Sequence, residues 1–227
     1  MDSRNKLRIV FGDVTVGIHG EDFHYIFSKQ TGGMESLVKA GKEWLYRTPY
    51  PTFWRATTDN DRGNGFPLRS GMWLGADQFR KCIGFRLLAD GEAVENHNAL
   101  ENNVYSNQEY VQEAVLTYTY ETITVPATTV DVSYTVHADG KIHVLAHYHG
   151  KEGLPELPVL ECGLLCRQRQ SDIAMRVCQE KHIRTEWREE FMEDMKWKVF
   201  RSRHIWFPRN AGCIWRQNVL RYIERIR

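Results

Sequence analysis

Apolar and polar residues alternate through most of the first 165 residues, and this pattern predicts β structure. The clearest case is residues 113–150, EAVLTYTYETITVPATTVDVSYTVHADGKIHVLAHYHG, which alternate over three segments. Ala138, Asp139 and Gly140 form a turn signal between the second and third segments. Strands with this period bury one face and leave the other in water.

The N-terminal residues have the same character. Residues 7–20 are β-branched runs broken by glycine, and residues 23–45 predict three strands joined by two turns. Gly32 and Gly33 allow a positive φ at the first reversal. Only residues 70–85, SGMWLGADQFRKCIGF, leave room for one short helix. Together these patterns predict an all-β fold, an antiparallel β-sandwich.

Composition and charge exclude several classes of protein. Hydrophobic residues make up 42% of the 227 residues, enough for a core, and the net charge of +1 gives no reason to expect nucleic acid or an acidic membrane as a partner. No apolar run approaches the roughly 20 residues of a membrane helix. The first residues lack the apolar stretch of a signal peptide, and five irregularly spaced cysteines imply no disulfide framework. A reducing, cytoplasmic setting is expected.

The stretch TFWRATTDNDRGNGF, residues 52–66, places polar residues directly after two aromatic ones. Phe53 and Trp54 are expected to be buried anchors, because aromatic side chains bring a large apolar area into a core. Asp59, Asn60 and Asp61 favour turns, and the glycines after them add backbone freedom. The pattern predicts a firmly anchored but mobile polar loop, a kind of segment that often carries function.

This stretch resembles the FWRAPTDND-type signature of glycoside hydrolase family 2 β-galactosidases, at the start of their last large β-domain. Residues 7–49 and the motif WLGADQF, residues 73–79, resemble the same domain. The resemblance runs over about residues 1–165. It is closest to the small subunit of two-chain enzymes of Gram-positive bacteria, a separate polypeptide that starts with its own methionine, as here. It implies a galactose-mutarotase-like β-supersandwich.

The resemblance also implies a role for residues 59–69, which would border the galactoside site and move when substrate binds. The candidate substrate-binding residues are Asp59, Asn60, Asp61, Arg62, Gly63 and Asn64, and the anchors of their loop are Phe53, Trp54 and Arg55. In this family the two catalytic glutamates lie in a barrel domain, on the large subunit of two-chain forms. We therefore expect a large catalytic subunit as partner, with Mg²⁺ and Na⁺ on that subunit and no cofactor on this chain.

The same residues permit other roles. In an extended segment Asp59 and Asp61 would share one face, about 6–7 Å apart, as in a glycosidase pair or a metal site. A purely structural turn network is a further alternative. Arg55 is expected to pair with Asp59 or Asp61 rather than contact sugar. Trp54 is expected to pack in the core rather than stack on a sugar ring.

Three histidines, His143, His147 and His149, share one face if residues 141–149 form a strand. Three imidazoles on one face can bind zinc. However, the rise of a strand puts His143 about 13 Å from His147, too far to share one ion. A solvated sheet face is therefore expected.

The C-terminal residues depart from the β pattern. Residues 166–227 hold only one of the 17 glycines but four of the seven tryptophans. In another reading frame, their codons can encode YEGLSGKTYPDRMAGG and then a stretch with VPQE, and these resemble downstream motifs of the same family. We infer a single-base frameshift near Leu165 or Cys166. The native domain would be residues 1–165, and residues 166–227 would be an out-of-frame tail that packs poorly or forms stray helix, for example in RTEWREEFMEDMKWKVF. Cys178 and Cys213, in this tail, receive no role.

Three functional hypotheses follow. The first is the small subunit of a heteromeric β-galactosidase, inactive alone, which with its large subunit hydrolyses terminal β-galactosides such as lactose with retention. The second is a free-standing carbohydrate-binding or aldose-epimerase-like β-sandwich, which would use a histidine and a glutamate in a sugar cleft. The third is a fragment of a single-chain enzyme, against which the start at Met1 argues.

Overall fold

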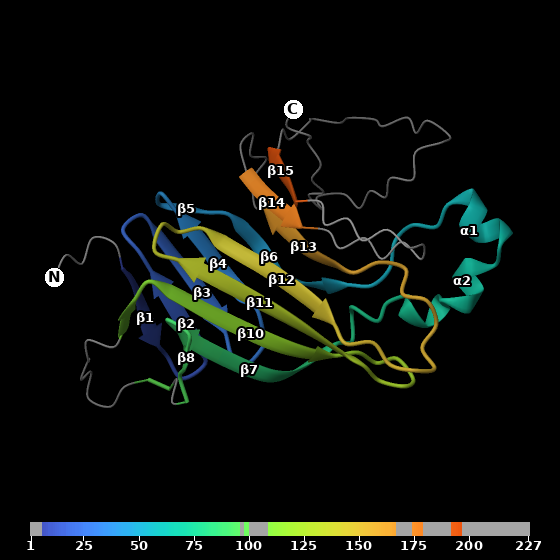
Figure 1. The fold of residues 1–227 in the computed structure, drawn as a ribbon, viewed down its shortest axis with the longest axis horizontal. Helices are drawn as coiled ribbons and strands as arrows, with labels where there is room; N and C mark the ends of the chain where they lie inside the picture. Colours follow the sequence, from blue (N-terminus) through green and yellow to red (C-terminus); the bar gives the residue numbers. More distant parts are fainter. Residues whose placement is uncertain (1–5, 96–97, 100–108, 167–173, 179–191, 197–227) are drawn as a thin grey trace.

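Antiparallel sheets dominate the part of the chain that the computed structural model describes, residues 6–95, 98–99, 109–166, 174–178 and 192–196. Figure 1 shows the strands stacked in a sandwich, with the helical turns at one end. The strands in the N-terminal half are β1 (Leu7–Phe11), β2 (Thr15–His19), β3 (Phe23–Ser28), β4 (Met34–Lys39), β5 (Lys42–Glu43), β6 (Leu45–Thr52), β7 (Lys81–Ala89), β8 (Glu92–Ala93) and β9 (Tyr110–Val111). The later strands are β10 (Glu113–Glu121), β11 (Thr129–His137), β12 (Ile142–Tyr148), β13 (Glu161–Cys166), β14 (Ala174–Cys178) and β15 (Met192–Lys196). The predicted all-β, antiparallel fold is confirmed.

Two large sheets form the sandwich. One has six strands in the order β5-β4-β3-β2-β1-β9, and the other has five in the order β12-β11-β10-β7-β8. Consecutive strands are neighbours in most of both sheets, as expected for chains joined by short reversals. The reversal between β3 and β4 uses Gly32 and Gly33 at φ +75° and +89°, as the sequence predicted, and the predicted turn after β11 contains Gly140 at φ +76°.

The core lies between the two sheets and follows the alternation of the sequence. In β10 every second side chain is buried, and β11 repeats the pattern in register, so that Leu116 lies opposite Tyr134. The rings of Phe27 in the six-stranded sheet and Tyr134 in the five-stranded sheet meet edge to face with centroids 5.5 Å apart. The Tyr25 hydroxyl donates to the carbonyl of Gly140 at 2.7 Å, and burial raises the pKa of Tyr25 to about 12.

Three short helical turns follow β6: α1 (Asp59–Gly63), α2 (Phe66–Arg69) and the 3₁₀ turn η2 (Gly71–Trp73). Only the last lies in the stretch where the sequence left room for a helix. The expectation that residues 59–69 form a loop was therefore wrong, as was the expectation of no other helix in this part of the chain. These helices are too short to show a 3.6-residue period. Helix α1 begins with a side-chain cap, whereas α2 and η2 have no such cap and are attached by the buried side chains of Phe66 and Trp73.

The C-terminal residues contribute strands rather than helix where they are described. Strand β13 pairs with β6, and β14 pairs with β15 in a separate two-stranded sheet. The stray helix expected in RTEWREEFMEDMKWKVF is wrong for Met192–Lys196, because these residues pair with β14 and helix propensity is a weak prior against such pairing. The other residues of that stretch lie outside the described part. The domain boundary and the frameshift stay predictions.

Candidate functional site

The polar stretch singled out in the sequence forms a helical segment, residues 58–73, between β6 and β7. Figure 1 shows α1 and α2 projecting at one end of the molecule, beyond the ends of the strands. The segment is therefore attached to the sandwich at its base and exposed at its tip.

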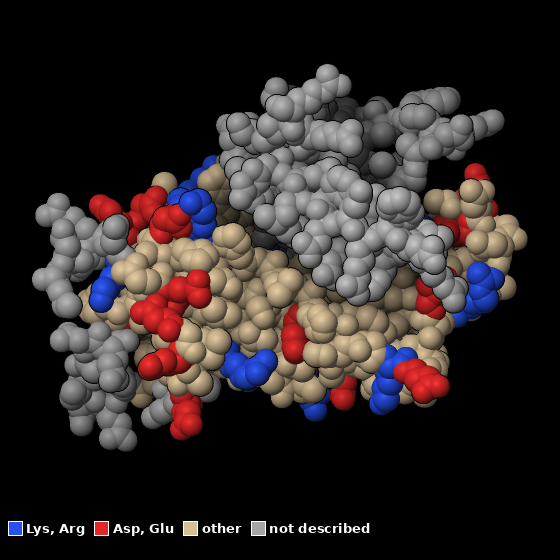
Figure 2. Space-filling model, in the orientation of Figure 1, with Lys and Arg blue, Asp and Glu red and all other residues tan. Residues whose placement is uncertain are grey.

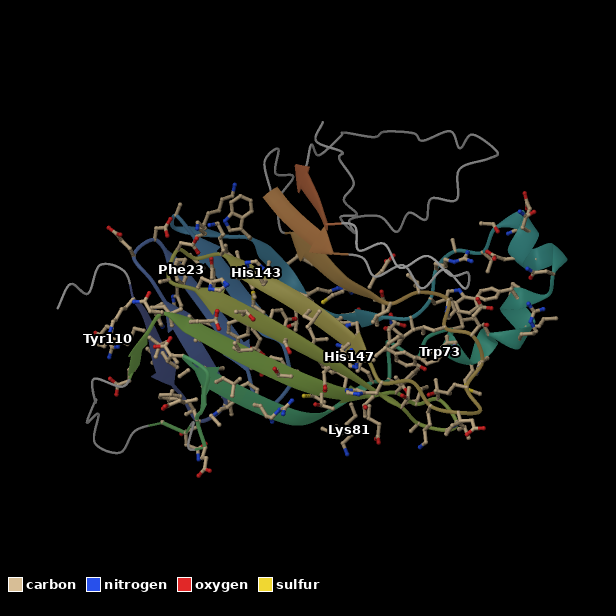
Figure 3. The ribbon with its side chains drawn as sticks, viewed as in Figure 1. Phe23, Trp73, Lys81, Tyr110, His143 and His147 are labelled. Carbon is tan, nitrogen blue, oxygen red and sulfur yellow. The ribbon has the colours of Figure 1, made fainter. Side chains whose placement is uncertain are left out.

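Aromatic side chains attach the helical segment. Phe53 and Trp73 are fully buried, with ring centroids 5.6 Å apart, so Phe53 is the anchor that the sequence predicted. Figure 3 shows Trp73 at the end of the sandwich next to the helical turns. Its indole donates to the carbonyl of Pro155 at 3.2 Å, and its ring meets that of Tyr148 edge to face with centroids 5.8 Å apart. Trp54 is half-buried, stacks on Phe66 at 6.4 Å and packs against the core, as expected. Trp73, a second anchor, had not been singled out, although it opens the WLGADQF motif.

Asp61 holds the helical segment to its base. Its carboxylate oxygens accept from the Arg55 guanidinium at 2.5 Å and 2.9 Å. This is one of the two ion pairs that the sequence predicted for Arg55, whose guanidinium also lies 5.4 Å from the Phe66 ring centroid. The hydrogen bond from Arg55, together with those from Thr58, holds the pKa of Asp61 well below its usual range. Asp61 is therefore ionised at neutral pH and has no proton to donate.

Thr58 and Asp61 also start helix α1. The Thr58 hydroxyl accepts from the Asp61 amide at 3.2 Å, and the Asp61 carboxylate accepts from the Thr58 amide at 2.7 Å. This reciprocal arrangement is a capping box. Thr58 had not been singled out, although the Thr-x-x-Asp spacing was a sequence signal for it.

The side chains of Asp59 and Asp61 differ in exposure and in ion-pair partner. The side chain of Asp59 is 91% exposed and pairs with Arg62, whereas that of Asp61 is 12% exposed and pairs with Arg55. The expectation that the two carboxylates share one face was wrong, because it assumed an extended backbone. In a helix, residues two apart lie about 200° apart around the axis.

The remaining candidate residues lie at the exposed tip of the helical segment. Asn60, Arg62, Gly63 and Asn64 are all exposed. The Asn64 side chain accepts from the Phe66 amide at 2.9 Å, and Gly65 adopts φ +73° between α1 and α2. The tip thus presents a carboxylate, amides and a guanidinium, groups that hydrogen-bond to hydroxyls of a neutral sugar or to another protein.

The three candidate histidines are exposed on and just after the edge strand β12. Figure 3 shows His143 and His147 apart along this strand, and all three imidazoles are exposed. His149 pairs with Asp131 at 2.8 Å and meets the His147 ring at 4.8 Å. In the described part of the chain, no three His, Cys, Asp or Glu side chains come together as a metal site.

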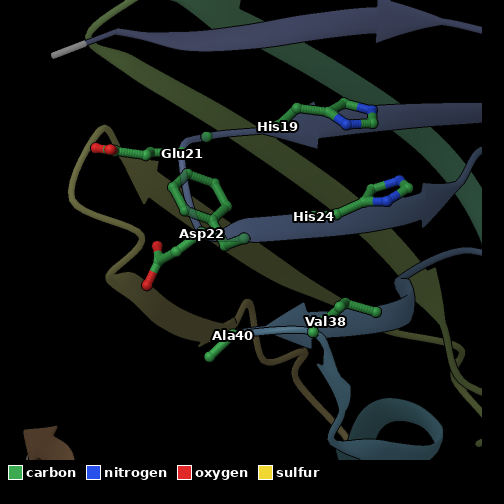
Figure 4. A pocket seen from close by; sticks show the side chains of 9 residues that line it. His19, Glu21, Asp22, His24, Val38 and Ala40 are labelled. Carbon is green, nitrogen blue, oxygen red and sulfur yellow. The ribbon is translucent and has the colours of Figure 1, made fainter. Parts of the chain in front are cut away.

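A shallow cavity of about 350 Å³ lies at a corner of the six-stranded sheet, lined by His19, Glu21, Asp22 and His24 among others. The imidazoles of His19 and His24 stack with centroids 4.0 Å apart. In Figure 4 the carboxylates of Glu21 and Asp22 point away from these rings. A histidine and a glutamate therefore do not converge there, and the cavity lends no support to an epimerase-like site.

Comparison with known proteins decides the family. The model of the β-galactosidase small chain matches residues 19–172. The chain belongs to the β-galactosidase small-chain family. It is 61% identical over 158 residues to a β-galactosidase small subunit of Latilactobacillus sakei, a match that covers 70% of this chain and 50% of that protein. It is also 43% identical over 159 residues to a β-galactosidase of Clostridium acetobutylicum, covering 70% of this chain and 16% of that protein.

This small-chain family member thus spans about half the length of the curated small subunit that it matches. In the described residues, no helix is both long and apolar enough to cross a membrane. Figure 2 shows acidic and basic side chains interspersed over the described part of one face, without a large patch of either sign.

Proposed function

We propose that this chain works as the small subunit of a heteromeric β-galactosidase and that its helical segment forms part of the rim of the active site. With a large catalytic subunit, it would hydrolyse terminal non-reducing β-D-galactose residues of β-galactosides such as lactose. The observation that carries the proposal is the two-sided construction of residues 58–73. One side is fixed by Trp73 and the Arg55–Asp61 pair, and the other exposes polar groups at the tip.

The proposal assigns the chemistry to the partner. Retaining hydrolysis needs two carboxyl groups about 5–5.5 Å apart, one as nucleophile and one as general acid and base. Asp61 does not suit the acid role, because its pKa is lowered by Arg55, whereas a glycosidase acid needs a raised pKa. The large subunit would therefore supply both carboxyl groups and hold Mg²⁺ and Na⁺. The cytoplasm is the proposed location.

In this scheme the tip contributes to substrate binding. Asp59 and Asn60 are exposed and can accept or donate hydrogen bonds to sugar hydroxyls. Arg55 and Asp61 act as positioning residues, since they fix the base of α1 rather than face solvent.

The test combines the purified chain with a large subunit of a two-chain β-galactosidase and measures hydrolysis of a chromogenic galactoside. The complex should be active and either chain alone inactive. The double variant Asp59→Asn/Asn60→Ala should raise KM about 3- to 10-fold, the equivalent of one or two hydrogen bonds, with a smaller change in kcat.

The matched control is Glu92→Gln, an exposed change on β8 at the other end of the molecule. It should leave KM unchanged. An assembled complex without activity would overturn the subunit role. An active complex whose KM is the same with and without the double substitution would overturn the rim role alone. Titration calorimetry of the isolated chain with galactose should show weak or no binding, because the large subunit would supply the catalytic carboxyl groups of the site.

A further inference from the structure

The imidazoles of His19 and His24 lie side by side on β2 and β3, and the ladder between these strands holds them close. The two residues are directly opposite each other, and their ring centroids are 4.0 Å apart (Figure 4). The amide of Gly20 donates to the carbonyl of Phe23 at 3.0 Å, so the next pair, His19 and His24, is a non-hydrogen-bonded pair of the ladder. Side chains at such pairs come closest together. The backbone thus presents two imidazoles within reach of one ligand.

The neighbouring Gly17 leaves room for this arrangement. A Cβ at this position would lie 2.7 Å from Nε2 of His19, which is closer than unbonded atoms approach. Residues 17 and 19 share one face of β2, because side chains alternate along a strand. The missing side chain therefore lets the His19 ring lie along the strand beside the ring of His24. Both imidazoles are only partly buried, and the cavity of about 350 Å³ borders both residues.

Other histidine contacts in the described part of the chain are already engaged with carboxylates. These contacts are His137–His143, with Glu113 at 3.3 Å from His137, and His147–His149, with Asp131 at 2.8 Å from His149. Among the described residues, neither His19 nor His24 pairs with a carboxylate. Of these contacts, the His19–His24 pair is therefore the one whose ring nitrogens do not compete with an ion pair for a new ligand.

Two imidazoles at this spacing suit a divalent transition-metal ion. Metal–nitrogen bonds of about 2.0–2.1 Å allow one ion to bridge two nitrogens up to about 4.2 Å apart. The rings lie 27° from parallel, so each must turn about χ2 to aim a nitrogen at the ion, and this torsion is broad in histidine. Imidazole nitrogen is a good ligand for Ni²⁺, Cu²⁺ and Zn²⁺, whereas Mg²⁺ and Ca²⁺ prefer oxygen.

The charged groups around the pair are compatible with a bound cation. Glu21 and Asp22, exposed in the turn between β2 and β3, border the cavity. Because they point away from the rings in Figure 4, they would contribute negative charge rather than ligands. Arg8 lies opposite His19 on β1, and its guanidinium is 5.9 Å from the ring centroid of Tyr110 on β9. An ion between β2 and β3 would therefore be separated from Arg8 by strand β2.

We propose that His19 and His24 form a two-histidine site for a divalent transition-metal ion of the Ni²⁺, Cu²⁺ and Zn²⁺ class. No third His, Cys, Asp or Glu joins them within the described residues, so water would complete the coordination of the ion. The site uses no residue of the helical segment and no part of the galactosidase reaction. Its failure and the failure of the proposed function are therefore independent.

The test titrates the full chain, purified without a polyhistidine tag, with NiCl₂ in a calorimeter. His19→Gln and His24→Gln should each weaken the tightest binding step at least about tenfold, because the second imidazole of a fixed pair binds intramolecularly. The matched control is His143→Gln, which removes an exposed imidazole from another histidine contact and should change the affinity less than about twofold. MgCl₂ should give no such step, since Mg²⁺ prefers oxygen ligands.

Two further measurements locate the ion on the unchanged protein. Substoichiometric Cu²⁺, which is paramagnetic, should broaden the amide NMR signals of residues 17–26 before those of other segments. Ni²⁺ at about a hundredfold excess over its Kd should raise the melting temperature by at least about 3 °C. Both histidine variants should lose this rise, whereas His143→Gln should keep it.

Three results would overturn the proposal. The first is a Ni²⁺ affinity that is the same in the unchanged protein and in a folded His19→Gln or His24→Gln variant, with folding checked by circular dichroism. The second is Cu²⁺ broadening that begins outside residues 17–26, and this result decides the matter even if neither variant folds. The third is equally tight binding of Mg²⁺ at the pair, which would exclude the transition-metal class.

Discussion

The sandwich and the helical segment are stabilised in different ways. In β10 and β11 every second side chain is buried, so the stability of the sandwich comes from the burial of many apolar side chains. Residues 58–73 depend on a few specific contacts: the Phe53–Trp73 pair, the Arg55–Asp61 ion pair and the Thr58 cap. The comparison teaches that a polar segment can have a well-defined structure without a core of its own, provided that a buried aromatic residue and a charged pair attach it to a core nearby.

The largest expected effect on stability comes from making the same substitution, leucine to alanine, in each of the two regions. Leu116→Ala in β10 should lower the free energy of unfolding by about 3–4 kcal/mol, because a fully buried leucine leaves a cavity. Leu68→Ala in α2, where the side chain is 91% exposed, should change it by less than about 0.5 kcal/mol. Urea unfolding followed by tryptophan fluorescence measures both. Equal losses would contradict the contrast.

A smaller effect separates the two aspartates inside the helical segment. Asp61→Asn should cost about 2 kcal/mol, because it weakens both the pair with Arg55 and the capping box. It should also speed hydrogen exchange at residues 58–64. Asp59→Asn, at an exposed position, should leave stability within about 0.5 kcal/mol of the unchanged protein. If the two substitutions had the same effect, the assigned anchor role of Asp61 would be wrong.

The smallest expected effect is on the pH dependence of stability, to which His19 in the sandwich and Asp61 in the helical segment contribute in different pH ranges. Burial, with the nearby His24 and Arg8, lowers the pKa of His19 below its usual 6.5. The His19 imidazole therefore binds a proton more tightly in the unfolded chain than in the folded one. The contribution of neutral His19 to the free energy of unfolding is present above pH 6.5 and is lost as the pH falls below 6.5. The Asp61 contribution, from a lowered carboxyl pKa, is present above pH 3.8 and lost only at lower pH.

His19→Gln should accordingly flatten the dependence of the melting temperature on pH between pH 7 and pH 5. The same variant should leave the steeper loss below pH 4 in place. Scanning calorimetry across this range checks both statements. An unchanged slope between pH 7 and pH 5 would show that another group controls it.

The sequence predicted much of this arrangement, and its errors have physical causes. The alternation in residues 113–150 predicted three strands, Gly32 and Gly33 marked a turn with positive φ, and Gly140 marked a second turn. The sequence predicted that Arg55 pairs with Asp59 or Asp61, because a charged side chain beside a buried aromatic residue needs a partner, and the structure shows the pair with Asp61. The two helices after Thr58 were missed, because helices of four or five residues show no hydrophobic period.

By itself, the sequence determined that this is an antiparallel β protein and that it resembles the β-galactosidase family, because both depend on local pattern and on a long motif. Only the tertiary structure decided which aspartate is held at the base of the helical segment and which is exposed at its tip, since that depends on the helical turn that separates Asp59 from Asp61. It also decided that β12 is an outer strand of the five-stranded sheet formed by the described residues. Strand order and burial are set by contacts between distant residues, which no local pattern specifies.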